Sequence, residues 1–233
     1  MIRLLGMGSP NVLKVILMLE ELGLDYRPEW IDVMGGDQHG ADFRRLSPIG
    51  KVPVLVEFVP GEAPLAIAES GAILLYLAET RGAFLASDGA ERYAALQWLM
   101  IQMASLGPAG GQAIHFNAVA KDQPYSARRF GLDLDRVLVA IERRLGDTPY
   151  LAGEAYSIAD MAVFPWVRTA GRILRNLGIG DHTARWFDAI KQRSATRAAL
   201  AISDAWTERD RARFRLASPV EMDRYFNRSP ALS

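Results

Sequence analysis

The stretches Lys51-Val52-Pro53-Val54-Leu55 and Glu69-Ser70-Gly71-Ala72-Ile73-Leu74 carry the strongest structural signals in this chain. A proline cannot donate a hydrogen bond to a sheet ladder, so Pro53 predicts a special bend directly before a strand, for which a cis peptide bond is suited. Glu69 and Ser70 stand at the start of a helix whose apolar residues recur at helical spacing. The first amide groups of a helix are unsatisfied donors that attract carboxylates. Together the two stretches predict a backbone grip for a small peptide-like ligand.

Strand and helix signals alternate over the rest of the first eighty residues. A helix opens at Ser9-Pro10-Asn11 and stops at Gly23, in the preferred order of cap, proline and terminal glycine. Pro28 places its strand near a sheet edge. The expected strands are residues 2–5, 26–33, 54–58 and 64–68, and the expected helices are residues 9–22, 41–46 and the segment that starts at residue 69. This order predicts a thioredoxin-like domain.

The remainder of the chain carries helix signals and no convincing strand after residue 90. We expect helices over residues 91–106, 113–119, 125–145, 183–192 and 196–208, with Gly107-Pro108 and Gly110-Gly111 kinking or breaking the path between the first two. The apolar stripe of the third helix is predicted to be core and consists of Leu132, Leu134, Val137, Leu138, Ile141 and Leu145. Ser157-Ile158-Ala159-Asp160 matches an N-capping box that opens another apolar helix, which makes Asp160 structural.

These signals divide the chain into an α/β part and an all-α part. We predict a thioredoxin-like domain over residues 1–82, an all-helical domain over residues 90–215 and a C-terminal tail over residues 216–233. Arginines alternate with other residues from Arg209 to Arg215. We interpret this segment as solvated rather than as a nucleic-acid-binding arm.

Composition limits the classes of partner and of chemistry. Basic and acidic residues number 27 each, so no global field favours nucleic acid or an anionic membrane. No apolar run reaches the roughly 18 residues that span a bilayer, and residues 1–6 lack a signal-peptide core, so we expect a cytoplasmic protein. The chain has no cysteine, which excludes disulfides, thiolate metal sites and a thiol nucleophile of its own. We predict no metal site.

Glu69 and Ser70 suit the zwitterionic end of an amino acid. The helix amides and the Ser70 hydroxyl would meet its carboxylate, and Glu69 would meet its ammonium group. The plainer interpretation is that both residues only cap the helix. The bend at Val52-Pro53 upstream favours the ligand site.

The combined pattern resembles a cytosolic glutathione transferase over nearly the whole chain except the tail. The segments Ser9–Lys14, Glu69–Glu79, Leu96–Leu99, Leu106–Pro108 and His115–Asn117 resemble the bacterial nu class and its yeast prion-domain relatives. The resemblance implies glutathione or glutathione disulfide as the ligand, a homodimer, and glutathione-driven reduction of small disulfides rather than strong conjugation of aromatic electrophiles. With no protein thiol, both sulfurs in any exchange must belong to glutathione and its partner.

The resemblance also implies roles for individual residues. The Val52 backbone, next to Pro53, would pair with the cysteinyl unit of glutathione. Glu69 and Ser70 would hold the γ-glutamyl end. The other candidates are Lys51 and Gln38 at the glycyl end, Arg129 as a further ligand contact, and Gln102, His115 and Asn117 as residues that line the cleft or else belong to the core or an interface.

A thiol reaction at neutral pH needs the thiolate. Lowering a thiol pKa from about 8.5 to about 6.5 takes roughly 2.7 kcal/mol. A helix N-terminus typically supplies only about 0.3 to 1 kcal/mol, and a hydrogen bond to a charged group about 1.5 to 3 kcal/mol. We therefore predict that Ser9, Asn11 and the first amides of their helix hold the thiolate jointly. Which side chain matters more stays open, and a plain N-cap role is the alternative for Ser9.

Two other functions stay open at this point. The same thiolate could add glutathione to an organic electrophile, or the chain could be a non-catalytic binding module of the same fold. The intact set of Ser9, Asn11, Val52-Pro53 and Glu69-Ser70 argues against the module.

Overall fold

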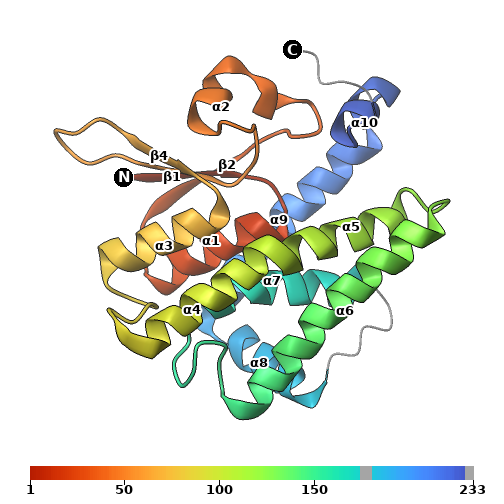
Figure 1. Cartoon of the computed structure of the whole chain (residues 1–233). Coiled ribbons are helices and arrows are strands. Elements are labelled where there is room, and N and C mark those ends of the chain that lie inside the picture. Colours follow the sequence, from red (N-terminus) through yellow and green to blue (C-terminus); the bar gives the residue numbers. More distant parts are fainter. Residues whose placement is uncertain (174–179, 229–233) are drawn as a thin grey trace. The chain divides into compact units, whose positions relative to one another are not determined.

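The computed structural model describes residues 1–173 and 180–228. The chain forms two compact units (Figure 1). The first unit combines Met1–Ile73 with the chain from Arg197 onward, and the second unit is Leu74–Thr196. Two helices pass from one unit into the other: α3 (Ser70–Arg81) and α9 (Ser194–Arg215).

A four-stranded sheet with the order β2-β1-β3-β4 organises the first unit. Its strands are β1 (Ile2–Gly6), β2 (Tyr26–Trp30), β3 (Val54–Glu57) and β4 (Leu65–Ala68). β1 and β2 run parallel, whereas the pairs β1–β3 and β3–β4 are antiparallel. β2 lies at the edge, as Pro28 predicts, because a proline leaves its ladder position without a donor. β2 ends three residues earlier than expected, at Trp30.

Helices of the first unit cover both faces of this sheet. Helix α1 (Pro10–Glu21) begins after its N-cap Ser9 and buries an almost continuous apolar run on one face. Helix α2 (Ala41–Leu46) lies on the other face, where Phe43 packs with Leu5, Val54 and Val56. A short 3₁₀ helix, η1 (Asp37–His39), precedes α2 and was not expected from the sequence. The thioredoxin-like prediction is confirmed.

The second unit contains only helices among its described residues. They are α4 (Gly89–Ile101), the π-helical segment η2 (Gln102–Leu106), α5 (Gly107–Ala118), α6 (Pro124–Asp147), α7 (Ile158–Ile173) and α8 (Asp181–Lys191). The all-helical prediction is therefore confirmed for this part of the chain.

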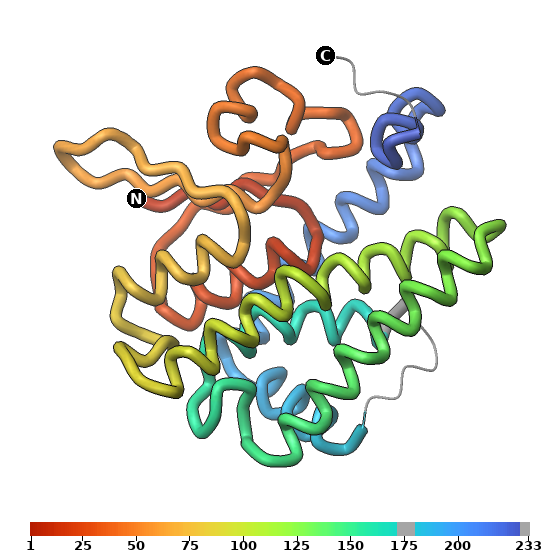
Figure 2. The backbone as a smooth tube through the Cα atoms, in the orientation of Figure 1, coloured from red at the N-terminus to blue at the C-terminus, as the bar shows by residue number. Residues whose placement is uncertain are grey.

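The predicted break of the helix at the glycines of residues 107–111 does not occur. The helical path is continuous from Gly89 to Ala118 (Figure 2). It widens to a π-helix before Gly107. Gly110 serves packing instead, because a Cβ atom there would lie 2.9 Å from the ring of Trp166. Close approach of an aromatic ring, rather than backbone freedom, explains this glycine.

Helix α6 confirms most of the predicted core stripe. Leu134, Leu138, Ile141 and Leu145 are buried, with spacings of four, three and four residues. Leu132 is 54% exposed, so its assignment to the core was wrong. It precedes Leu134 by two positions, which places it on the opposite side of a helix with 3.6 residues per turn.

Asp160 closes the predicted capping box at the start of α7. Its Oδ2 accepts hydrogen bonds from the Ser157 backbone N–H at 3.0 Å and the Ser157 hydroxyl at 3.1 Å. Its Oδ1 accepts from the Leu151 N–H at 2.9 Å and from Trp186 Nε1 at 2.8 Å. Complete burial raises the pKa of Asp160 to about 6, against the effect of these four donors. The structural interpretation of Asp160 is confirmed.

The arginine-rich end of α9 is not simply solvated, which corrects the sequence interpretation. Helix α9 extends to Arg215, and Arg213 Nε donates to Asp32 Oδ2 at 2.7 Å. Arg213 also pairs with Glu221 of the short helix α10 (Pro219–Tyr225). These contacts need a fold that returns the C-terminal helix to the sheet, so a local charge pattern could not reveal them. The last five residues of the predicted tail, 229–233, lie outside the described residues.

No helix within the described ranges is long and apolar enough to cross a membrane.

Candidate active site

Three of the predicted ligand segments meet at one edge of the sheet in the first unit. Gly6, the last residue of β1, pairs with Trp30, the last residue of β2. At the same edge Leu5 pairs with Val54, which begins β3, and Val54 pairs with Ala68, which ends β4. The segments that follow β1, precede β3 and follow β4 therefore converge. They carry Ser9, Val52-Pro53 and Glu69-Ser70.

Ser9 begins α1 as its N-cap. The Ser9 backbone is extended, with φ −131°, and its Oγ accepts a hydrogen bond from the Val12 N–H at 3.3 Å. Since that contact uses only an oxygen lone pair, the hydroxyl proton can still be donated to a ligand. Asn11 follows as the second residue of the helix. The capping role and the predicted thiolate-binding role of Ser9 are thus compatible.

The peptide bond between Val52 and Pro53 is cis, which confirms the predicted bend. Both residues precede Val54 and lie outside the β1–β3 and β3–β4 ladders. A buried serine that sequence reasoning missed closes this loop. The Lys51 N–H donates to Ser47 Oγ at 2.9 Å, and the Ser47 hydroxyl donates to the Lys51 carbonyl at 2.8 Å. The Lys51 side chain remains exposed.

Gln38 is a buried residue whose side-chain oxygen has no hydrogen-bond partner among the described residues. Its residue exposure is 7%, and its Nε2 donates to the Val33 carbonyl at 3.0 Å. Its Oε1 is buried without a hydrogen-bond partner among the described residues. The loop before Pro53 comes close to Gln38, because a Cβ atom on Gly50 (φ +62°) would lie 2.8 Å from the Gln38 carbonyl oxygen. An acceptor placed in this way suits an N–H donor of a ligand.

Glu69 and Ser70 lie at the start of α3 in contrasting environments. Glu69 adopts φ +70°, a left-handed conformation that is uncommon for a residue with a side chain, and its carbonyl accepts from the Ile73 N–H at 3.0 Å. Its side chain is exposed, whereas Ser70 is 2% exposed. Residues held in such conformations concentrate at functional sites.

Lys14 is a second polar residue that sequence reasoning missed. Its Nζ donates to Ser70 Oγ at 3.2 Å, and the residue has no exposed surface. Burial lowers the pKa of Lys14 to about 7, while the charge of Glu69 acts in the opposite direction. The available signal was a lysine in the middle of the apolar run from Val12 to Leu19.

The backbone that precedes Ser9 is held by the C-terminal helix. The Gly8 N–H donates to Asp210 Oδ2 at 2.6 Å, and Trp30 Nε1 donates to Asp210 Oδ1 at 2.8 Å. A Cβ atom on Gly8 would lie 2.5 Å from the Thr207 backbone, so only glycine allows this approach. Burial raises the pKa of Asp210, and the two donors oppose that shift.

Four further candidates lie in the second unit. Gln102 is 1% exposed in η2, and His115 packs edge-on against Phe116 with ring centroids 5.2 Å apart. Asn117 Nδ2 donates to the Ala113 carbonyl of its own helix at 2.7 Å, which favours a structural role. Arg129 is exposed on α6 and donates to the Tyr125 hydroxyl at 3.5 Å. Their roles toward a ligand stay predictions.

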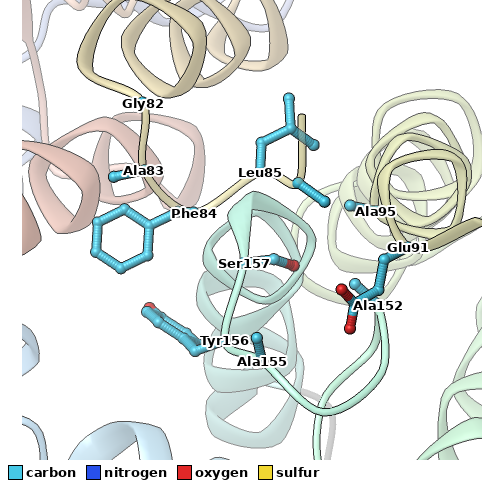
Figure 3. Close-up of a pocket in the computed structure, with 11 residues that line it drawn as sticks. Gly82, Ala83, Phe84, Leu85, Glu91, Ala95, Ala152, Ala155, Tyr156 and Ser157 are labelled. Carbon is cyan, nitrogen blue, oxygen red and sulfur yellow. The ribbon is translucent and has the colours of Figure 1, made fainter. Parts of the chain in front are cut away.

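The second unit also contains a cavity of about 250 Å³ between the α3–α4 connection and the segment before α7 (Figure 3). Phe84 and Tyr156 face each other there edge-to-face, with centroids 6.0 Å apart. Glu91 is the charged side chain in its lining, and none of the predicted ligand residues takes part.

Within residues 1–173 and 180–228, no group of three or more His, Asp or Glu side chains could hold a metal ion. The groups that converge at the sheet edge are hydrogen-bonding groups, among them the Ser9 hydroxyl, the buried Gln38 Oε1 and the Ser70 hydroxyl.

Residues 8–80 match the family model for the glutathione S-transferase N-terminal domain, and residues 124–199 match that for the glutathione S-transferase C-terminal domain. The chain belongs to the glutathione S-transferase family. Over 212 residues it is 42% identical to the disulfide-bond oxidoreductase YfcG of Escherichia coli, an alignment that covers 90% of this chain and 99% of YfcG. The family resemblance predicted from the sequence is confirmed.

Solved glutathione transferases share the fold of this family member. The structure from Pseudomonas fluorescens with two glutathione bound is 36% identical to this chain and has a TM-score of 0.78. The alignment covers 85% of this chain and 92% of that one. The structure from Pseudomonas putida with one glutathione disulfide bound per subunit is also 36% identical and has a TM-score of 0.79. That alignment covers 85% of this chain and 90% of the other.

Proposed function

We propose that this glutathione S-transferase is a glutathione-dependent disulfide-bond reductase. The observation that carries the proposal is the convergence, at one sheet edge, of the N-cap Ser9, the cis Val52-Pro53 bond and the left-handed Glu69 before buried Ser70. The similarity to YfcG, a disulfide-bond oxidoreductase, favours disulfide chemistry over conjugation.

In this proposal the tripeptide lies along the sheet edge. The Val52 backbone pairs with the cysteinyl unit next to Pro53, and Glu69 and Ser70 take the γ-glutamyl end. Gln38 and Lys51 take the glycyl end, which is supported by the buried Gln38 Oε1, an acceptor for a ligand N–H. Arg129 is the further candidate for a ligand contact, and Gln102, His115 and Asn117 are candidates for the cleft.

The thiol of glutathione lies in this arrangement at the start of α1. The Ser9 hydroxyl, the Asn11 side chain and the first amides donate to its sulfur and stabilise the thiolate. Helix amides and charge-assisted hydrogen bonds together reach the roughly 2.7 kcal/mol that a two-unit pKa decrease requires. The chain has no cysteine, so the ligand supplies the nucleophile.

The reaction consists of two thiol–disulfide exchanges. The glutathione thiolate attacks one sulfur of the substrate disulfide, forms a mixed disulfide and releases the first thiolate, which takes up a proton. A second glutathione thiolate attacks the glutathione sulfur of the mixed disulfide and releases the second thiol. Two glutathione molecules are thereby oxidised to glutathione disulfide while one disulfide is reduced to two thiols. The P. fluorescens structure has two glutathione bound, which supports a reaction that uses a pair of them.

Parallel assays with glutathione test this function. Hydroxyethyl disulfide reports disulfide reduction, and chlorodinitrobenzene reports conjugation. We expect turnover of the disulfide to exceed conjugation clearly. Predominant conjugation would identify a transferase proper, and activity in neither assay without calorimetric glutathione binding would identify a non-catalytic module; either outcome contradicts the proposal.

A homodimer in the cytoplasm completes the proposal. Disulfide reduction by glutathione needs a compartment whose glutathione pool is kept reduced, which the cytoplasm provides. Light scattering of the purified protein and fractionation of cells that express it test these two points.

A further inference from the structure

Lys14 is a charged side chain in the apolar interior of the first unit. It lies in α1 between buried Leu13 and Val15 and has no exposed surface itself. Burying an ammonium group is costly unless neighbouring groups accept its hydrogen bonds or balance its charge. A lysine at this position therefore calls for a role that an apolar residue of the same size could not fill.

Ser70 is the neighbour that connects Lys14 to the proposed ligand site. Lys14 Nζ donates to Ser70 Oγ at 3.2 Å, and Ser70 is almost completely buried. A protonated lysine has three donors and no acceptor, so toward Lys14 the Ser70 oxygen can only accept. Ser70 must then direct its own O–H proton away from Lys14. A hydroxyl with this polarity is a donor suited to a carboxylate.

The charges at the start of α3 also favour a carboxylate next to Ser70. Burial works against the positive charge of Lys14 and lowers its pKa to about 7, and the charge of Glu69 restores part of the decrease. A carboxylate that binds next to Ser70 would add a second negative charge near the ammonium group. An opposite charge within about 4–6 Å favours the charged form of a buried group. Ligand binding and protonation of Lys14 therefore reinforce each other.

We propose that Lys14 is a positioning residue for the α-carboxylate at the γ-glutamyl end of the ligand. It acts through Ser70, which it holds as a hydrogen-bond donor, and it places a buried positive charge behind that hydroxyl. The inference rests on the proposed function, because it takes glutathione as the ligand. It makes the free α-carboxylate the ligand group that Lys14 selects.

Calorimetry with two thioethers tests this role at pH 7. One ligand is S-methylglutathione, and the other is its analogue with 4-aminobutyryl in place of γ-glutamyl, which lacks only the α-carboxylate. We expect Lys14→Met to weaken binding of S-methylglutathione about ten- to a hundredfold, the range of a hydrogen bond to a charged group. Binding of the analogue should change by less than about twofold, because it lacks the group that Ser70 contacts. A merely structural role would weaken both ligands alike.

Matched variants separate the role of Lys14 from general packing. Met18→Leu alters a buried apolar residue of the same helix and should leave the preference for S-methylglutathione intact. Lys14→Arg keeps charge and donors and should retain that preference. In a Ser70→Ala background, Lys14→Met should cost little further affinity, because the two residues act in series. Lys14→Gln serves the same comparison if Lys14→Met does not fold.

The outcomes distinguish this inference from the proposed function. Equal weakening of both ligands, or no weakening, in a folded Lys14 variant overturns the role of Lys14 but does not contradict the proposed function, as long as the wild-type protein binds S-methylglutathione. Failure of the wild-type protein to bind S-methylglutathione overturns the proposed function, and this inference with it.

Discussion

At the scale of single residues, the proposed roles of Ser9 and Lys14 depend on which group donates and which group accepts each hydrogen bond. The Ser9 oxygen accepts from the Val12 N–H, which leaves its proton for a thiolate. The Ser70 oxygen accepts from Lys14 Nζ, and in our proposal the Ser70 hydroxyl donates to the carboxylate of the ligand. In both proposed roles a contact within the protein orients a hydroxyl that would donate to an anion of the ligand.

Separate alanine substitutions of Ser9 and Asn11 test thiolate stabilisation. Each lost hydrogen bond to the sulfur should raise the pKa of bound glutathione by about 1 to 2 units, since such bonds are worth about 1.5 to 3 kcal/mol. Ultraviolet absorbance of the thiolate measures this pKa. Ser218→Ala removes the serine N-cap of α10 and is the matched control, for which no change is expected. If neither Ser9→Ala nor Asn11→Ala raises the pKa, the activation model fails.

The burial of Lys14 predicts a pH dependence of stability in the ligand-free protein. Its pKa is about 7 in the folded state, against an ordinary value of 10.5. Between these values the unfolded chain binds more protons, so the cost of burying Lys14 is full below pH 7 and fades as the pH rises toward 10.5. The free energy of unfolding should gain at most about 1.4 kcal/mol per pH unit in this window.

Urea unfolding of wild type and Lys14→Met at pH 7 and pH 9 measures this contribution. The difference between the two proteins cancels the titration of other groups. Wild type should gain stability relative to the variant as the pH rises. A difference that does not change with pH would show that Lys14 keeps its proton in the folded protein up to pH 9, so that its pKa is not lowered.

At the scale of elements, the start of α1 depends on a helix from the far end of the chain. Asp210 of α9 accepts from Gly8, which lies directly before Ser9, and from Trp30. Arg209 of the same helix lies over the Trp30 ring, with its guanidinium carbon 3.8 Å from the ring centroid. Contacts of α9 thus hold the backbone directly before Ser9 and the neighbouring Trp30 side chain.

Asp210→Ala should impair disulfide reduction without removing any group that contacts the ligand. Loss of both acceptors would allow the Gly8–Ser9 backbone to shift, and misplacement by about 1 Å can cost on the order of a hundredfold in rate. The pKa of bound glutathione should rise in parallel. Arg211→Ala, on the exposed side of the same helix, is the control and should leave both quantities unchanged. Unaltered turnover in Asp210→Ala would contradict this anchoring role.

The start of α7 is the corresponding anchor of the second unit. Asp160→Ala would leave the donors of Ser157, Leu151 and Trp186 buried without their acceptor. Each buried unsatisfied group costs about 1–3 kcal/mol, so the free energy of unfolding should fall by about 3 kcal/mol or more. Urea unfolding measures the loss, with exposed Asp135→Ala as the control. A loss of under about 1 kcal/mol would refute a structural role of this size.

Local signals predicted most elements because each signal acts over a few residues. Ser9 and Pro10 start α1, Pro28 marks an edge strand, and Ser157 with Asp160 starts α7. The widening of the helical path at η2 was not predicted. Neither was the close packing of Gly110 against Trp166, because it joins residues of two different helices. The same limit applies to Leu132, whose exposure depends on which side of α6 faces the core.

At the scale of the whole molecule, sequence alone predicts the fold class, the cis Val52-Pro53 bend and the residue types of the ligand site. Cap, turn and periodicity signals are local, and together they match a family pattern. The absence of cysteine adds that the reactive sulfur must come from the ligand.

Only the tertiary structure decided how these parts support one another. The Lys14–Ser70 bond joins residues 56 positions apart, and the Asp210–Gly8 bond joins residues 202 positions apart. No periodicity or spacing encodes such pairs, because they depend on which elements pack together and on the side that each presents. Burial then determines their chemistry, since a lysine in the apolar interior has a different pKa, and a different role, from one on the surface.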